Sequence, residues 1–278
     1  MMPSDSDTKW AGLTLDQPRV MGILNVTPDS FSDGGSHVGV DNAIAAGLAM
    51  AEAGADIVDV GGESTRPGAD QVSAETEQAR ILPVIRALAA ADIRISVDTR
   101  NASTMRAALG AGASIINDIS GLSYDPRSLG VVAEHGCPVV VMHMRGTPAT
   151  MNGEAVYRDV VTEVRAELAN RVDAALAAGI RRDRIAIDPG LGFAKDATHS
   201  VAVLRGLGTL ADLGYPMLVG LSRKRFIGAL SEERRPDQRL GGSLAAGLFA
   251  ILRGASILRV HDVRETVQAI RVWRALFE

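Results

Sequence analysis

Eight short apolar runs are spaced along the chain, and polar residues follow each run directly or within a few positions. A helical pattern, with apolar residues at spacings of three and four, succeeds most of the runs. A repeated order of strand, polar tip and helix is the pattern of a (β/α)8 TIM barrel, an α/β fold. Because the site of this fold is built at the carboxyl ends of its strands, we expect the polar tips, among them Glu63 after the second run and Asp118 after the fourth, to meet in one pocket. We interpret as its strands the runs 20–24, 57–60, 93–97, 115–116, 139–142, 185–187, 217–221 and 257–258.

The segments between the runs predict helices and two long loops. Segment 25–39 is rich in Asp, Ser, Gly and Pro, and segment 61–69 is polar, so we expect long first and second βα-loops. Long loops without regular structure are usually functional or disordered, and we expect these two to close over a substrate. Asp41 is the predicted N-cap of the first helix. The other helices are expected at 74–91, 102–109, 128–134, 160–178, 200–213, 243–252 and 263–276, with a solvated loop at 232–239.

The length of the chain fits one barrel domain. It has 278 residues, near the roughly 250 of a typical barrel, and no linker or shift in composition divides it. We expect residues 1–18 to form a flexible N-terminal tail and residues 19–278 to form the domain. Aromatic residues make up only 4% of the chain, so Ala, Val, Ile and Leu must fill the core.

The charge distribution and the cysteine content indicate which partners and which cellular compartment to expect. The net charge is −4 and the basic residues are dispersed, whereas binding to nucleic acid needs a concentrated basic face. No apolar stretch reaches the ~20 residues that span a bilayer, and the polar N-terminus lacks the apolar segment of a signal peptide. Cys137 is the one cysteine, so no internal disulfide can form. We therefore expect a cytoplasmic protein that binds neither nucleic acid nor membranes.

Four polar side chains predict an anion site. Asn25, Lys224, Arg259 and His261 follow the first, seventh and eighth runs, which are neighbours in a closed barrel, and barrels often bind phosphate there. Arg259 and His261 alternate along one strand and point the same way, and an arginine fork beside a histidine suits phosphate oxygens. Asn25 offers an amide oxygen to a Mg²⁺ already bound to phosphates. The alternative is a salt-bridged Arg259 and a core histidine.

Two acids and an amide end other runs of the predicted barrel. Asp98, Asn117 and Asp188 follow the third, fourth and sixth runs and should point into the barrel mouth. A buried carboxylate is costly unless it is paired, and a nitrogen heterocycle with adjacent amino and ring N–H donors would pair it through two hydrogen bonds. The set therefore suits the edge of a pterin or a purine. The alternative for each acid is a structural cap or a pair with a nearby lysine.

Lysines and histidines allow further chemistry, which the sequence disfavours. Lys195 and Lys224 are each placed to pair with Asp188. A Schiff-base lysine needs a depressed pKa, and both lysines lie among acids. The five histidines have no metal-ligand spacing, so a protein-ligated zinc is not expected. His143 opens a loop, and we expect it to be structural rather than a base.

The polar tips and loops lie in the segments 21–35, 59–68, 96–99, 116–121, 142–148, 188–195, 220–228 and 259–263. Taken in order, these motifs closely resemble the dihydropteroate synthase family. A single motif would be weak, but the ordered set runs from about residue 20 to the C-terminus at family-like spacing. The departures are small: Leu191 and Ala194 stand where the family often has Phe and Gly, and they remove no reactive group.

The resemblance implies a transferase of folate biosynthesis. In its reaction the amine of p-aminobenzoate displaces pyrophosphate from 6-hydroxymethyl-7,8-dihydropterin pyrophosphate, giving 7,8-dihydropteroate. It also implies Mg²⁺, a homodimer and inhibition by sulfonamides. The implied catalytic residues are Asp98, Lys224 and Arg259; the pterin would contact Asp98, Asn117, Asp188, Phe193, Lys224 and Met142; p-aminobenzoate would contact Phe31, Thr65, Arg66, Pro67 and Ser222; pyrophosphate would contact Asn25, Arg259 and His261, and Asn25 would also bind the metal.

Two alternatives remain beside this family. One is a methyltransferase on the same scaffold that binds a reduced folate, but it should lack the loop pair 31–35 and 64–67 and the Arg259/His261 site. The other is a non-catalytic paralogue, which should have lost at least one of four residues: Asp98, Asp188, Lys224 and Arg259. The chain retains all of these features, so we expect the enzyme.

Overall fold

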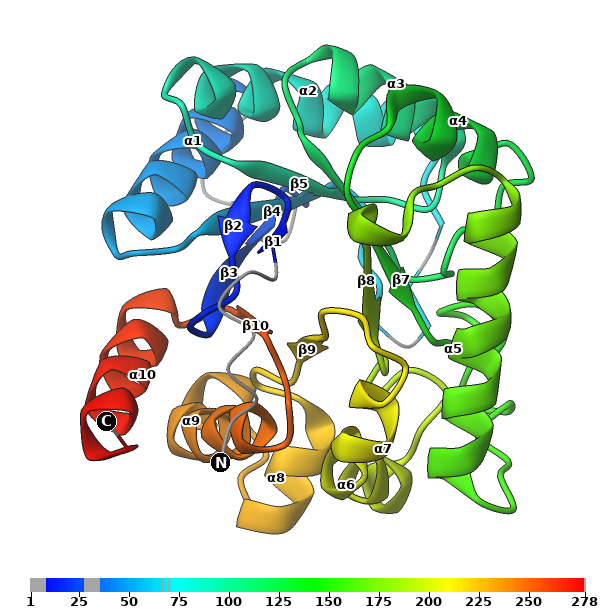
Figure 1. Ribbon diagram of the computed structural model, residues 1–278. Coiled ribbons are helices and arrows are strands. Elements are labelled where there is room, and N and C mark those ends of the chain that lie inside the picture. Colours follow the sequence, from blue (N-terminus) through cyan, green and yellow to red (C-terminus); the bar gives the residue numbers. More distant parts are fainter. Residues whose placement is uncertain (1–8, 28–35, 67, 70, 278) are drawn as a thin grey trace.

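The computed structural model describes residues 9–27, 36–66, 68–69 and 71–277, and its eight parallel strands form a barrel surrounded by helices (Figure 1). The strands are ordered β8-β7-β6-β5-β4-β3-β10-β9, and a parallel bridge between Ile187 and Met217 joins β8 to β9. The predicted TIM barrel is confirmed. Its strands are β3 (Arg19–Asn25), β4 (Ile57–Gly61), β5 (Ile95–Asp98), β6 (Ile115–Asp118), β7 (Val139–Met142), β8 (Ile185–Asp188), β9 (Leu218–Gly220) and β10 (Ile257–Val260).

The helices cover the outside of the barrel, and the main core lies between them and the strands. Strand residues such as Val58, Val60 and Val97 alternate outward into this core. None of the helices in the described ranges combines the length and apolar character of a membrane span. The helices are α1 (Ser36–Glu52), α2 (Ala74–Ala90), α3 (Ala102–Gly110), α4 (Ser128–His135), α5 (Val160–Ala177), α6 (Ala197–Arg205), α7 (Leu207–Ala211), α8 (Arg225–Ser231), α9 (Leu240–Leu252) and α10 (Val263–Phe277), with short 3-10 turns η2 (Arg182–Arg184) and η3 (Pro236–Gln238).

Three helix predictions need correction. Helix α1 begins at Ser36, so Asp41 lies inside it and is not its N-cap. The helix predicted over 200–213 is broken at Gly206, where a Cβ would lie 2.7 Å from a methyl of Val161 on α5. Helix α8 was missed because a helix of about two turns has too few residues to show a period.

The inside of the barrel has two layers. The lower layer is apolar and consists of Met21, Ile57, Ile115, Val140, Ala186, Leu218 and Ile257. Because side chains alternate along a strand, the residues two positions further on also point inward. Four of these positions, on β4, β6, β8 and β10, hold Asp59, Asn117, Asp188 and Arg259. A polar layer therefore lies directly above the apolar one, towards the carboxyl ends of the strands.

An N-terminal hairpin covers the apolar layer from below. Strands β1 (Lys9–Trp10) and β2 (Leu13–Thr14) pair antiparallel. Trp10 is 1% exposed, packs against the lower layer, and donates from Nε1 to Arg184 O at 3.0 Å. The loose tail expected over 1–18 is thus wrong for this hairpin, since the indole packs against the barrel; residues 1–8 lie outside the described residues.

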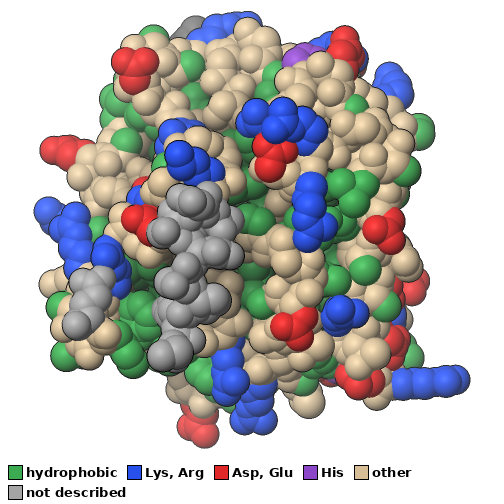
Figure 2. Space-filling model, in the orientation of Figure 1, with side chains coloured by type: hydrophobic (Ala, Val, Ile, Leu, Met, Phe, Trp, Pro, Cys, Tyr) green, Lys and Arg blue, Asp and Glu red, His purple; other side chains and the backbone are tan. Residues whose placement is uncertain are grey.

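Basic and acidic side chains are interspersed on the face drawn in Figure 2.

Candidate active site

Arg259 is the centre of the polar layer. From β10 its Nε donates to Asp59 Oδ2 on β4 at 2.6 Å, and its Nη2 donates to Asp98 Oδ2 on β5 at 2.7 Å. These contacts join residues 200 and 161 positions apart in the sequence. The expected meeting of Arg259 and Asp98 at one rim is confirmed. The structure also bears out the alternative of a salt-bridged arginine.

Asp59 was not among the residues predicted for the site. It is 0% exposed, and its Oδ2 also accepts from Asn117 Nδ2 at 3.0 Å. Its other oxygen, Oδ1, is buried without a hydrogen-bond partner among the described residues. The available signal was the alternation Ile57, Asp59, which places an acid inside a buried strand; we interpreted the run as wholly apolar.

Burial dominates the electrostatics of the site. It raises the pKa of Asp98 to about 7, although Arg259 acts to lower it. It raises the pKa of Asp188 to about 6, against the hydrogen bond from the Gly190 N–H, and it lowers the pKa of Lys224 to about 8, although Asp188 opposes this. Burial also acts to lower the pKa of Arg259, but Asp59 and Asp98 outweigh it and raise that pKa. A substrate that donates N–H groups to these acids would favour their charged forms.

A mixed wall of apolar and charged groups flanks Asp188. Oδ1 of Asp188 accepts from Gly190 N at 2.7 Å. Lys224 Nζ lies 4.2 Å from the centre of the Phe193 ring, a cation–π contact. Met142 and Phe193 belong to one apolar cluster beside the site. Neither Lys195 nor Lys224 forms an ion pair with Asp188 within the described structure, so that expectation is not met.

His261 and Ser222 meet at the ends of β10 and β9. Ser222 Oγ accepts from the His261 backbone N at 3.2 Å and lies 3.1 Å from its Nδ1. Burial lowers the pKa of His261 to about 4, so the ring is neutral at physiological pH. Next to them Arg223 pairs with Asp262. This contact joins a residue expected at the pyrophosphate to one expected at p-aminobenzoate.

The loop residues are only partly placed. Asn25 is half-buried at the carboxyl end of β3, between β4 and β10. Thr65 is half-buried and Arg66 is exposed on the loop after β4. Phe31 and Pro67 lie outside the described residues. The expected closure of the first two loops therefore stays a prediction.

Two polar tips serve the local backbone and its surroundings instead of the pocket. Glu63 accepts two hydrogen bonds from Arg100, at 3.1 and 3.0 Å. Asp118 accepts from the backbone N–H groups of Ser120 and Leu122, at 2.7 and 3.1 Å. Asp118 is satisfied within its own loop and Glu63 by an arginine of the next loop, so the expectation that every tip points into the pocket is wrong for both.

The fold and this polar layer define a barrel enzyme of the pterin-binding class, and a family model described as "Pterin binding enzyme" matches residues 21–261. The chain is 47% identical over 264 residues to the dihydropteroate synthase of Escherichia coli (strain K12), covering 95% of this chain and 93% of that one. It is 48% identical over 266 residues to that of Mycobacterium leprae (strain TN), covering 94% of each.

Solved structures agree with these relatives. Dihydropteroate synthase from Xanthomonas albilineans with 4-aminobenzoic acid superposes with a TM-score of 0.91 at 52% identity, covering 96% of each chain. The same enzyme in complex with 7,8-dihydropteroate gives 0.87 at 50% identity, covering 95% of each chain. The chain belongs to the dihydropteroate synthase family. It is a transferase of folate biosynthesis, as the sequence predicted.

Proposed function

We propose that the polar layer binds 6-hydroxymethyl-7,8-dihydropterin pyrophosphate and that p-aminobenzoate enters from the loop side to give 7,8-dihydropteroate. The observation that carries this proposal is the convergence of Asp98, Asn117, Asp188 and Arg259 on one rim of the barrel. Acids and an amide suit a flat heterocycle that is rich in N–H donors. A cation in the same layer suits its diphosphate.

The pterin ring is held by acceptors whose other atoms are already engaged. Asn117 donates from Nδ2 to Asp59, so its Oδ1 is the atom that accepts from a ring or amino N–H. Asp188 engages Oδ1 with Gly190 N and presents Oδ2. Met142 and Phe193 supply apolar contact to the ring, and Lys224 adds a donor beside it. Because the acceptors are fixed in advance, ordering them costs little when the pterin binds.

The leaving group lies at the anion side of the layer, held by Arg259, His261 and Asn25. A neutral His261 ring offers a hydrogen bond, and Arg259 supplies charge. The described residues contain no group of three or more acids, histidines or cysteines that would hold a metal, and the amide oxygen of Asn25 suits a Mg²⁺ that the diphosphate already binds. Asn25 would therefore be its protein ligand, with the diphosphate oxygens and water as the others. Bound Mg²⁺ would neutralise part of the charge on the departing diphosphate.

In the proposed reaction the C–O bond to the diphosphate breaks first, and the diphosphate keeps the electron pair. Asp98, as a buried carboxylate, stabilises the resulting pterin cation electrostatically. The amine nitrogen of p-aminobenzoate then forms the C–N bond and loses one proton. Closure of the first two loops would exclude water, which competes with the amine. The amine side is assigned to Phe31, Thr65, Arg66, Pro67 and Ser222.

We further propose a cytoplasmic homodimer. Apolar side chains are exposed on three consecutive helices, Leu230 on α8, Leu252 on α9, and Val272, Leu276 and Phe277 on α10. A second copy would cover them. Sedimentation at micromolar concentration should give twice the chain mass of 29.2 kDa. A monomer under those conditions would contradict this part of the proposal.

The test of the activity is pyrophosphate release that requires both substrates. We expect no release with the pterin substrate alone and steady release once p-aminobenzoate is added. Release without the amine would indicate a hydrolase, and no release in either mixture would indicate a binding protein. A sulfonamide should compete with p-aminobenzoate and leave binding of the pterin substrate intact.

A further inference from the structure

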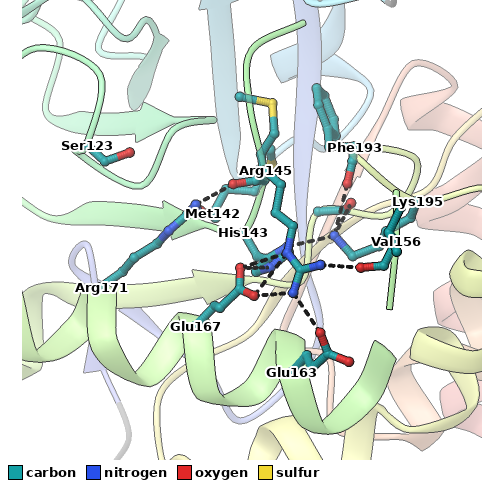
Figure 3. Close-up of polar contacts among 12 residues, drawn as sticks. Ser123, Met142, His143, Arg145, Val156, Glu163, Glu167, Arg171, Phe193 and Lys195 are labelled. Carbon is teal, nitrogen blue, oxygen red and sulfur yellow. Dashed lines mark hydrogen bonds and ion pairs between the residues drawn. The ribbon is translucent and has the colours of Figure 1, made fainter. Parts of the chain in front are cut away.

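Lys195 is a buried lysine outside the polar layer, and its hydrogen-bond partners are two carbonyls of the β8–α6 loop and the His143 ring. Lys195 is 4% exposed. Its Nζ donates to Gly190 O at 3.1 Å and Phe193 O at 3.0 Å, and it lies 2.8 Å from His143 Nδ1 (Figure 3). An ammonium group has three N–H donors, and the site offers three acceptors. No donor of Lys195 is left to contact a substrate.

The loop that Lys195 holds needs such support. It connects β8 to α6, and three of its residues have left-handed backbone: Gly190 (φ +65°), Gly192 (φ +78°) and Ala194 (φ +49°). At Gly190 a Cβ would lie 2.0 Å from His143 O, so only glycine fits there. One backbone hydrogen bond, Phe193 N to Gly190 O at 3.0 Å, closes the turn. The ammonium contacts the same Gly190 carbonyl and the carbonyl of Phe193, at the two ends of the turn.

This loop carries groups that face the pterin side of the pocket. The Gly190 N–H fixes Oδ1 of Asp188 at 2.7 Å. The Phe193 ring lies 4.2 Å from Lys224 Nζ. A shift of the turn would therefore move a hydrogen-bond donor of Asp188 and an apolar wall together. It would not move Arg259 or Asp98, which are on β10 and β5.

A chain of polar contacts that runs from Arg145 through Glu167 to His143 holds Lys195 in place. His143 Nε2 lies 2.9 Å from Glu167 Oε2 on α5, and Arg145 Nε donates to Glu167 Oε1 at 3.0 Å (Figure 3). Burial lowers the pKa of His143 to about 4, so the ring is neutral. The nitrogen that faces a carboxylate carries the proton, which makes Nδ1 an acceptor. Burial lowers the pKa of Lys195 to about 7, but the pattern of three acceptors requires its ammonium form.

We infer that Lys195 is a positioning residue for the pterin subsite, and that the Glu167–His143 pair holds its ammonium against the β8–α6 loop. This inference rests on the proposed function, because the pterin is the ligand whose wall the loop forms. The chain of contacts runs from Glu167 on α5, through His143 at the end of β7, to the β8–α6 loop. Lys195 touches neither substrate and no reacting atom.

The first variant is Lys195→Met, which keeps the length of the side chain and removes the three donors. We expect the Kd of the pterin pyrophosphate, measured by calorimetric titration, to rise about tenfold. The KM of p-aminobenzoate and kcat at saturating substrates should change by less than about threefold. An unchanged pterin Kd, or an equal rise in the KM of p-aminobenzoate, overturns the inference. So does a collapse of kcat with pterin binding intact, which would make Lys195 catalytic.

The second variant acts at the far end of the chain of contacts. Glu167→Gln removes the charge that holds the proton on His143 Nε2 and should raise the pterin Kd in the same direction. In the double variant the two effects should fall short of their sum, since they act on one contact. The matched control is Glu163→Gln on the same helix; Glu163 pairs with Arg145 but contacts neither His143 nor Lys195. Its pterin Kd should stay within about twofold of the wild type.

These outcomes separate the two proposals. If the wild-type protein releases no pyrophosphate with both substrates, the proposed function fails. If the wild-type protein releases pyrophosphate and Lys195→Met binds the pterin normally, only the positioning role fails. Should Lys195→Met not fold, Glu167→Gln and its control decide: an unchanged pterin Kd in Glu167→Gln overturns the inference.

Discussion

Replacing Arg259 with methionine tests whether one cation holds the charged layer together. Arg259 is paired with Asp59 at 2.6 Å and Asp98 at 2.7 Å. With ~4 Å between charge centres and an effective dielectric constant of about 20, each pair attracts by about 4 kcal/mol. The variant no longer has to bury the charge of the arginine, and this gain offsets part of the lost attraction. We therefore expect the free energy of unfolding to fall by about 3–5 kcal/mol.

The dependence of this loss on pH follows from Asp98. Arg259 favours the ionised form of Asp98, whose pKa burial raises to about 7. Without the arginine that pKa rises further, so the folded variant takes up a proton more readily. The destabilisation should be smallest below about 7 and should grow as the pH rises from there towards the higher pKa of the variant.

Urea unfolding at pH 6 and pH 9 measures the effect, followed by circular dichroism and by the fluorescence of Trp10 and Trp273. Asp59→Asn added to Arg259→Met removes one uncompensated charge and should recover about 2 kcal/mol at pH 9. Pyrophosphate release should be lost in the single and in the double variant, because both lack the cation of the anion site. A loss below about 1 kcal/mol at pH 9, or an equal loss at both pH values, would refute the reasoning.

Four further predictions follow from the same contacts. The kcat/KM for the pterin substrate should rise with pH as Asp98 ionises near 7 and fall as Lys224 deprotonates near 8; Lys224→Arg should move the falling limb to higher pH, and a fixed limb would exclude Lys224 as its source. Asp98→Asn should cut kcat by about 10²–10³ while circular dichroism shows that the fold survives; near-normal turnover would refute its role. Trp10→Ala should cost about 3–5 kcal/mol of stability and leave kcat intact, since the hairpin lies at the opposite end of the barrel. Chelation of Mg²⁺ should weaken binding of the pterin substrate, and Asn25→Ala should blunt that response.

The strands and the rim of the site were predictable because two regularities act together. Alternation along a strand decides which side chains point inward, and closure of the barrel brings distant strand ends together. Arg259 and Asp98 could thus be assigned to one cleft although 161 positions separate them. The sequence could not give their direct contact, because an arginine at a strand end reaches either a ligand or a neighbouring acid.

The predictions failed where a local feature resembled a different one. Asp59 on β4 lies within a run that we interpreted as wholly apolar. Glu63, four residues later, was therefore predicted to be the functional residue at the end of this strand. Glu63 instead binds Arg100, and Asp59 binds Arg259. The N-terminal hairpin has strands of two residues, too short for any period, so the single apolar anchor Trp10 was its only signal.

The two inner layers of the barrel have opposite energetic roles. The apolar layer, closed by Trp10, stabilises the fold by removing apolar surface from water. The polar layer above it works against stability, since burial shifts the pKa values of Asp98, Asp188 and Lys224 towards their neutral forms. Such a layer persists only where the surrounding structure holds each group in place. A bound pterin and diphosphate would supply the N–H donors and the negative charge that these groups lack. Part of the binding energy of the substrate would then come from relieving an unfavourable charge arrangement already present in the protein.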